Sequence, residues 1–214
     1  MKELLIRNLE TGEIDFKIEG DFTVEDRSKE VSKNDLAAYV KVGARNAGEK
    51  FQYANKTWVV MEHVCGGTFC LSEEILFEKC FDEDNSSDWS TASLRKYLND
   101  DFIKELVKDG ASVDDLLAFS RDLTSDDGLK TYCKDIVDKV SLISCEEYRD
   151  WRANIPAKDD WWWTLTPYST SENSNSYFVR YVSSSGTLKN IGAYSGGRGV
   201  APLLYLKSDT EVLV

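Results

Sequence analysis

Three adjacent tryptophans, Trp161-Trp162-Trp163, constrain the fold of this chain more than any other feature. Three indole rings left in water would cost several kcal/mol, so each ring must pack in a core or line a binding face. In an extended segment neighbouring side chains point to opposite faces, which places Trp161 and Trp163 on one side and Trp162 on the other. We expect one side to lie in the core and Trp162 to rim a binding surface.

The segment that follows is rich in Ser, Asn, Tyr and Gly from Tyr168 to Arg198. This composition is typical of adaptable binding surfaces, in which Tyr gives rigid amphipathic contacts and Ser, Asn and Gly give flexible hydrogen bonds. The alternative is a set of well-solvated loops without a ligand. On the first interpretation residues 165–198 form a recognition surface, with contacts from Tyr168, Asn173, Asn175, Tyr177, Tyr181, Asn190 and Tyr194.

The bulk composition is that of a folded domain. With 3 prolines, 13 glycines and 42% apolar residues in 214, the chain is long enough for a sizeable core and is not of disordered composition. No apolar run reaches the ~20 residues of a membrane span, and the first residues do not form a signal peptide. Five cysteines in no metal-binding spacing predict reduced, mostly buried thiols and a cytoplasmic protein, or a phage particle assembled there: Cys65, Cys70, Cys80, Cys133 and Cys145.

The net charge of −12 is concentrated in the middle of the chain. Residues 71–160 carry 23 acidic and 12 basic side chains, whereas residues 161–214 carry 3 and 4. Without a basic stripe, direct binding to nucleic acid is disfavoured. The acidic middle is either a solvated surface or, as an alternative function, the active face of an intracellular inhibitor that mimics nucleic acid toward a basic enzyme.

Hydrophobic periodicity predicts mostly strands and a few helices. Alternation predicts a hairpin over residues 1–24 with a turn at 10–13. A charged linker follows to residue 45, in which a helix could start at Ser32 or Asn34 and continue to Val40. Further strands are expected near residues 51–61, as a hairpin that turns around Ala54-Asn55-Lys56, and near residues 69–71, 141–144, 177–182, 188–193 and 200–206. Helical spacing is found at residues 72–76 and 90–106, where Asp88 or Ser90 could cap the longer helix, and a capped helix should follow residue 144.

The order of these landmarks resembles the bacterial and phage family called domain of unknown function 6273. The resemblance covers about residues 46–208 and depends on Gly48–Phe51, Trp58-Val59-Val60, Leu71-Ser72, Trp89-Ser90, Ser93–Asn99, Val140–Ser144 with Glu147-Tyr148, the Trp-Trp and Thr-Pro segment, the 177–186 hairpin and Gly199-Val200 with Pro202. It implies two domains, residues 1–45 and 46–214.

The family is similar to the C-type-lectin-like superfamily, which includes formylglycine-generating enzymes and retroelement-diversified receptor-binding proteins. The resemblance therefore implies an α+β, C-type-lectin-like domain with antiparallel strands, a few helices and a long irregular loop region, plus an N-terminal β-hairpin. Leu165 and Ala201 stand where the family usually has arginines, so an anion site built on those two arginines is not expected in this chain.

Catalytic and metal motifs are weak. The relatives that generate formylglycine use late cysteines, but none follows Cys145, and the single histidine, His63, is not near a nucleophile elbow. Residues 82–88 resemble a calcium loop through Asp82, Asp84 and Asp88, yet the sixth position is Ser87 rather than Gly. We therefore expect no cofactor and a non-catalytic domain of phage or prophage type that binds a protein or glycan through residues 165–198, with its oligomeric state open.

Overall fold

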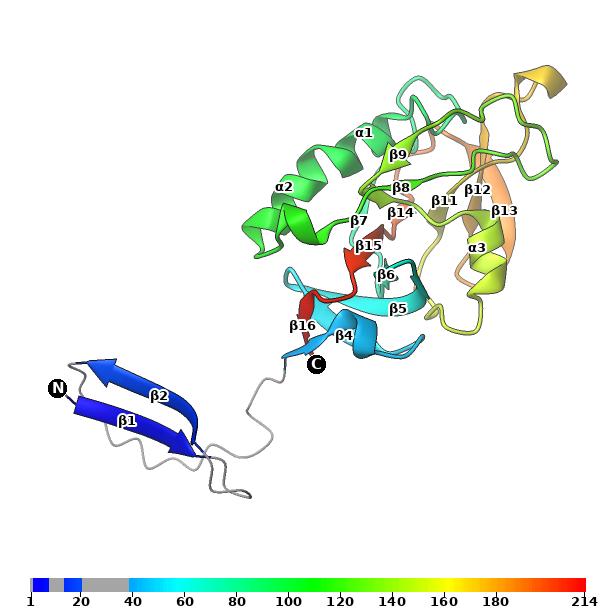
Figure 1. Cartoon of the computed structure of the whole chain (residues 1–214). Coiled ribbons are helices and arrows are strands. Elements are labelled where there is room, and N and C mark those ends of the chain that lie inside the picture. The colour runs from blue at the N-terminus through cyan, green and yellow to red at the C-terminus, as the bar shows by residue number, and fades with distance from the viewer. Residues whose placement is uncertain (1, 8–13, 21–38) are drawn as a thin grey trace. The chain divides into compact units, whose positions relative to one another are not determined.

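The computed structural model describes residues 2–7, 14–20 and 39–214, and its contacts divide the chain into two units, Met1–Leu36 and Ala37–Val214. In the first unit, β1 (Lys2–Arg7) and β2 (Ile14–Gly20) pair antiparallel, which confirms the predicted hairpin (Figure 1). The expected turn at residues 10–13 and the possible helix start at Ser32 or Asn34 lie outside the described residues.

The second unit is a mixed α+β domain whose larger sheet has seven strands in the order β10-β15-β6-β5-β4-β16-β3. The strands of this sheet are β3 (Tyr39–Lys41), β4 (Lys50–Tyr53), β5 (Lys56–Val64), β6 (Gly67–Ser72), β10 (Val140–Ser141), β15 (Leu203–Lys207) and β16 (Glu211–Leu213). The β4–β5 hairpin turns at Ala54 and Asn55, as predicted. Tyr39 and Val40 pair with β16 as a strand, so the prediction that a helix continues to Val40 is wrong there.

A five-stranded sheet has the order β13-β12-β11-β14-β7, and only its β11–β14 pair is parallel. Its strands are β7 (Phe77–Glu78), β11 (Trp162–Pro167), β12 (Phe178–Val182), β13 (Leu188–Gly192) and β14 (Gly199–Val200). A further pair consists of β8 (Phe119–Ser120) and β9 (Val137–Asp138). The single strand expected at residues 200–206 is instead two strands in different sheets, because the chain crosses at Ala201-Pro202, where proline has no N–H for a ladder.

The helices are short: α1 (Ser93–Asn99), α2 (Asp101–Lys108) and α3 (Cys145–Asp150), with 3-10 turns at Val42–Ala44, Val113–Asp115 and Ser171–Asn173. Within the described part of the chain, none is long and apolar enough to cross a membrane. The capping box predicted before α3 is present, since Ser144 Oγ accepts from Glu147 N and the Glu147 carboxylate accepts from Ser144 N.

Two helix predictions are corrected. The predicted 90–106 helix breaks at Asp100, and its first N–H, that of Ser93, donates to Asp82 Oδ1 rather than to Asp88 or Ser90. Asp88 instead accepts from Ser90 N in the preceding turn. Residues 72–76 form no helix, because Ser72 N donates to Pro202 O and Leu76 N donates to Val200 O, which keeps this segment extended.

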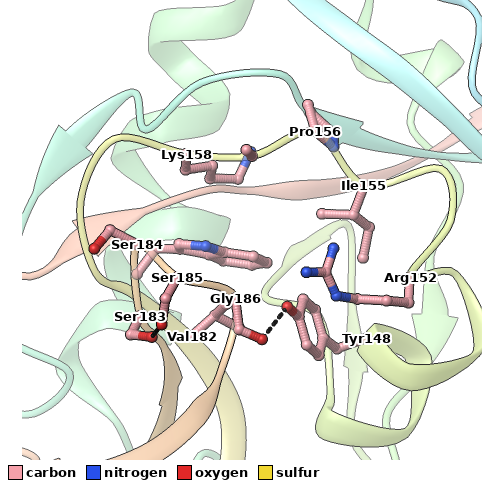
Figure 2. A pocket seen from close by; sticks show the side chains of 12 residues that line it. Tyr148, Arg152, Ile155, Pro156, Lys158, Val182, Ser183, Ser184, Ser185 and Gly186 are labelled. Carbon is pink, nitrogen blue, oxygen red and sulfur yellow. Dashed lines mark hydrogen bonds between the residues drawn. The ribbon is translucent and has the colours of Figure 1, made fainter.

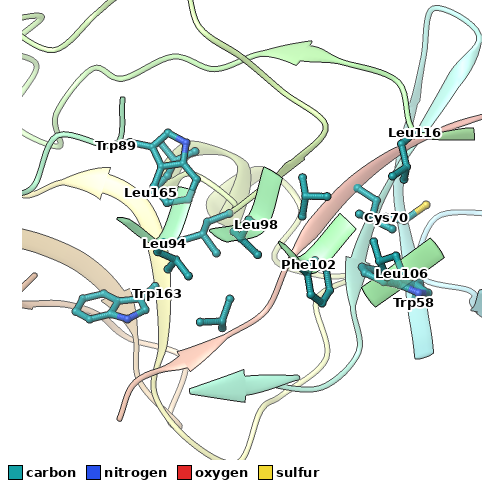
Figure 3. Close-up of a cluster of buried hydrophobic side chains, with 14 of the residues drawn as sticks. Trp58, Cys70, Trp89, Leu94, Leu98, Phe102, Leu106, Leu116, Trp163 and Leu165 are labelled. Carbon is teal, nitrogen blue, oxygen red and sulfur yellow. The ribbon is translucent and has the colours of Figure 1, made fainter. Parts of the chain in front are cut away.

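The tryptophan strand β11 separates two cores. Trp163 lies with Trp58, Trp89, Leu94 and Leu98 in one buried cluster (Figure 3), which also includes Val200 and Leu204. Trp161 packs against this cluster at its margin, whereas Trp162 belongs to a second cluster with Tyr148, Trp151 and Leu203. The alternation of faces along the triplet is therefore confirmed.

The five cysteines are free thiols with unequal exposure. Cys70 and Cys145 are buried and Cys80 is half-buried, but Cys65 and Cys133 are exposed, so the prediction of mostly buried thiols is wrong for those two. Cys65 lies in the tight turn between β5 and β6 with a φ of 47°, and no atom lies within 4 Å of a Cβ placed on the following Gly66, so this turn lies outside the core.

Replacing Trp58 or Trp163 by alanine should lower the free energy of unfolding by ~3–5 kcal/mol, because both indoles are fully buried. Urea unfolding monitored by circular dichroism measures the change. Tyr39→Ala is the control, since Tyr39 is 66% exposed and its loss should cost less than ~0.5 kcal/mol. An unchanged midpoint for Trp163→Ala would contradict this description of the core.

Thiol titration of the native protein should give two fast-reacting groups, Cys65 and Cys133, with a slower third from Cys80. Burial raises the pKa of Cys70 and Cys145, so both the accessibility and the thiolate fraction of these groups are low until denaturant is added. The double variant Cys65→Ser, Cys133→Ser should lose the fast phase. Five equally fast thiols would show that the domain opens readily.

Candidate ligand-binding site

The predicted contact residues differ widely in exposure. Tyr194, Tyr177 and Tyr168 are 63%, 40% and 36% exposed. Asn173 and Asn190 are also exposed, and Asn175 is half-buried. Tyr181 was expected to contact a ligand, but it is only 4% exposed. It stacks on Trp161 with ring centroids 5.1 Å apart and belongs to the core.

The register of the β12–β13 hairpin explains why Tyr181 is buried. Residues directly opposite in an antiparallel pair share a face, so Tyr181 and Val179 lie with Lys189 and Ile191 on the core side. Arg180 pairs with Asn190, Phe178 with Gly192 and Val182 with Leu188 on the opposite side, which we call the outer face. At the turn end of this outer face Val182 is buried in the second core and Leu188 packs against it, so the exposed part of the face is formed by Phe178, Arg180 and Asn190.

One end of the outer face carries an aromatic cluster. The Arg180 guanidinium lies 4.7 Å from the centroid of Tyr168, and Phe178 contacts both Tyr168 and Tyr177 with centroids 6.5 and 4.4 Å away. Tyr177 O accepts from Ala193 N, which brings the backbone next to Tyr194 to the same end of the hairpin. The exposed tyrosines of the prediction thus gather around the open end of one hairpin.

Asp126 fixes Arg180 in place. Its carboxylate accepts from Arg180 Nε at 2.9 Å and from Arg149 Nη2 of α3 at 2.8 Å. Burial alone would raise the pKa of Asp126, but the hydrogen bonds from the two guanidinium groups lower it below its usual value. The neighbouring Asp127 accepts from Ser169 and from Asn173 Nδ2, which holds the 168–173 loop beside the aromatic cluster.

The turn end of the same hairpin forms one wall of a pocket of about 80 Å³ (Figure 2). The other walls come from α3, the loop after it and the first residue of β11. The lining residues are Tyr148, Arg152, Ile155, Pro156, Ala157, Lys158, Trp162, Val182 and Ser183–Gly186. Trp162 is 2% exposed overall and so is mainly a core residue, but of the predicted contacts it is the one that reaches this pocket.

Tyr148 is hydrogen-bonded to the turn, and Arg152 packs against both of them. Tyr148 Oη donates to Gly186 O at 2.8 Å, and the Arg152 guanidinium lies 5.3 Å from the Tyr148 ring centroid. Gly186 has a φ of 77°, and a Cβ at this position would collide with Arg152 Nη2. Glycine is therefore required both by the backbone conformation and by the close approach of the guanidinium.

Lys158 is a buried cation at the opposite wall. Its Nζ donates to Ser72 O at 2.8 Å and to Glu73 O at 2.7 Å, and it lies 5.2 Å from the Trp162 ring centroid. Burial lowers the pKa of Lys158 to about 8, although the Glu73 and Glu74 carboxylates act in the opposite direction. The amine thus ties the 151–160 loop to β6.

The three calcium candidates are held by different contacts. Asp82 is buried and accepts from Ser86 N and Ser93 N, and Asp88 accepts from Ser90 and pairs with Lys134 at 3.2 Å. Asp84 is exposed. Among the residues that the structure describes, no three His, Cys, Asp or Glu side chains are grouped so as to hold a metal ion.

The sequence interpretation missed Tyr148, Arg152 and Lys158. They lie in α3 and in a charged loop without hydrophobic periodicity, and only the fold brings them to the 183–186 turn. The local sequence signal near these residues is the Ser-Ser-Ser-Gly run of the turn, and such a run by itself predicts only a connection between two strands.

The pKa of Lys158 leads to a test with Lys158→Met. Since the folded pKa of about 8 is below the value of 10.5 for a free lysine, the unfolded chain holds a proton between these pH values that the folded chain has released. The wild type should therefore gain up to about 3 kcal/mol relative to the variant between about pH 7 and pH 10. Other titrating groups cancel in the comparison, and a constant difference would contradict a lowered pKa.

Comparison with known proteins gives one match. The family model described as a domain of unknown function, DUF6273, matches residues 66–208, which include the whole pocket and the outer face. Neither the curated proteins nor the solved structures give a match.

Proposed function

We propose that this chain, which belongs to the DUF6273 family, is a non-catalytic recognition domain that binds a protein or glycan through residues 165–198. The observation that carries the proposal is the outer face of the β12–β13 hairpin. It has three exposed tyrosines near its open end and a pocket at its turn. Exposed tyrosines bind with little loss of conformational entropy, and they are enriched among residues that dominate binding energy.

A C-type-lectin-like fold of phage or prophage type is part of this proposal. It is supported by the mostly antiparallel α+β architecture and by the irregular segments between β11 and β12 and between β13 and β14. In such an arrangement a rigid sheet carries variable loops, which is how recognition domains separate stability from specificity.

The surroundings of His63 favour binding over catalysis. Its Nδ1 lies 2.9 Å from Thr68 Oγ1 and its Nε2 lies 2.7 Å from Arg45 O, on a different sheet from the hairpin. Both ring nitrogens are therefore engaged in contacts within the seven-stranded sheet region, and neither contacts a nucleophile in the pocket.

The alternative, an acidic inhibitor that mimics nucleic acid, has less support from the described residues. A mimic needs rows of free surface carboxylates, yet Asp109 pairs with Lys56, Asp126 with two arginines, and Asp138 with Arg95. These carboxylates hold segments of the domain together, so they are not available to a basic partner.

Binders selected from a peptide-display library and a glycan array test the proposal. Tyr168→Ala, Tyr177→Ala and Tyr194→Ala should leave the unfolding midpoint unchanged and weaken a selected binder by ~1–3 kcal/mol at the best-covered position. The part of the affinity that comes from these tyrosines should change little when salt rises from about 0.05 to 0.2 M, because the tyrosines are uncharged and residues 161–214 carry almost no net charge, with 3 acidic and 4 basic side chains.

Tyr39→Ala is the matched control, because Tyr39 is at least as exposed as the three tyrosines but lies on the other sheet, outside residues 165–198. The proposal would be contradicted by binders whose affinity is unchanged in the three tyrosine variants and falls steeply with salt. Such binders would favour the alternative in which the acidic surface is the active face.

A further inference from the structure

The pocket at the hairpin turn is lined by two cations in a chain of net charge −12, although the Glu73 and Glu74 carboxylates near Lys158 partly offset the charge of that lysine. Of the 12 residues that line it, two are cations, Arg152 and Lys158, and none is acidic. Figure 2 shows the two cations on different sides of the pocket. A concave site with charge of one sign and apolar walls concentrates the field on a ligand of opposite charge.

Arg152 is the group in this pocket that is ready to bind an anion. Its side chain is exposed, and within residues 39–214 it forms no ion pair and donates no side-chain hydrogen bond. The Tyr148 ring and the 183–186 turn nevertheless hold its guanidinium in place. A planar guanidinium fixed in this way matches the two oxygens of a carboxylate.

Two further donors belong to residues that line the pocket. The Trp162 indole N–H has no acceptor among the described residues, and it is not sealed from solvent, unlike the Trp163 N–H, which donates to Lys79 O. Ser183, Ser185 and Thr187 bond to one another, whereas Ser184 is exposed and outside this network. A ligand would meet Arg152, Ser184 and the Trp162 N–H.

The size of the pocket limits the group that can enter. A cavity of about 150 Å³ holds a benzene ring, so a volume of about 80 Å³ is too small for a sugar ring and suits a short stem. Ile155, Pro156 and Val182 give this stem an apolar wall. A carboxylate on a short aliphatic chain is found in the side chains of Asp and Glu and at the C-terminus of a peptide.

The edge of the sheet supports a peptide as the source of the carboxylate. β13 is the last strand of its sheet, and the bonds Ser183 N to Thr187 O and Ala193 N to Tyr177 O fix which residues face β12. By the alternation of antiparallel pairing, the N–H and C=O groups of Leu188 and Asn190 point away from β12. An extended peptide can pair with these free N–H and C=O groups as an added strand beside β13. The same peptide then runs past the 183–186 turn, which forms one wall of the pocket.

We propose that the Arg152 pocket binds the carboxylate of a peptide ligand, with the peptide backbone along β13. This assignment rests on the proposed function, because it names the ligand class for the same hairpin. Arg152 supplies the ion pair, Ser184 and Trp162 supply hydrogen bonds, and Lys158 contributes charge from the opposite wall.

The test is an NMR titration of the whole chain with small probes. N-acetylglutamic acid α-amide and N-acetylglycine present a side-chain and a chain-end carboxylate, and N-acetylglutamine amide is the neutral control. We expect shifts of the Ser184 and Gly186 amides and of the Trp162 indole N–H, with binding at least tenfold weaker for the neutral probe. The better of the two acids identifies the source of the carboxylate.

Arg152→Gln should weaken the acidic probe at least tenfold, and Arg152→Lys should give an intermediate loss because the charge remains but the planar fork does not. Lys189→Gln is the matched control. Lys189 is an exposed cation of the same hairpin, but it lies on the opposite face from the pocket. Its titration should match the wild type. All three variants should keep the wild-type unfolding midpoint.

Three results would overturn the assignment: equal binding of the neutral probe, no effect of Arg152→Gln, or tighter binding of methyl β-D-glucuronide, which would indicate a sugar acid. Failure here is distinguishable from failure of the proposed function. If the probes fail while the tyrosine variants weaken selected binders, only the pocket assignment is lost. If the probes bind while the tyrosine variants have no effect, the pocket assignment remains and the tyrosine surface is lost.

Discussion

Complete burial of β11 is the constraint on which the rest of the domain depends. All six of its residues are buried, and its alternating side chains serve two cores, Trp163 and Leu165 on one side and Trp162 on the other. The polar side chains between them are not left unpaired: Thr164 Oγ1 donates to Arg180 O, and Thr166 Oγ1 accepts from Cys145 N. An unpaired hydroxyl in such a place would be costly, so these bonds also fix β12 and α3 against the strand.

The position of the β12–β13 hairpin is set by β11, which pairs with β12. Because β11 is buried on both sides, β12 contributes Val179 and Tyr181 to one core and Val182 to the other, and only the Phe178 and Arg180 part of its second face is partly exposed. Asp126 joins Arg180 of β12 to Arg149 of α3, and Tyr148 of α3 joins the turn through Gly186. The hairpin is thus held at its base, its middle and its turn, so little ordering would remain for a ligand to impose.

Local chemistry could be predicted from the sequence, and long-range register could not. The alternation of the three tryptophans, the hairpins and the Ser144 cap follow from rules that act within a few residues. The burial of Tyr181 depends on which register β12 takes against β11, and the alternation of a strand does not say which face is inside. In the same way, the crossing at Pro202 depends on two sheets whose other strands come from distant parts of the chain.

The distribution of charge separates the groups that hold the fold from those available to a ligand. Asp138 is 1% exposed and accepts from Trp89 Nε1 and Arg95 Nε, and Glu147 forms a bidentate pair with Arg121. Burial would raise the pKa of Glu147, but Arg121 lowers it, so the acid stays ionised in the domain. A buried charge without its partner is strongly destabilising, which explains why these acids have dedicated cations.

Arg152 has no such partner among the described residues and nothing in the fold requires its charge. In a chain with an excess of acids, a cation held in a fixed orientation by its neighbours but left without a carboxylate is best explained by a ligand that supplies one.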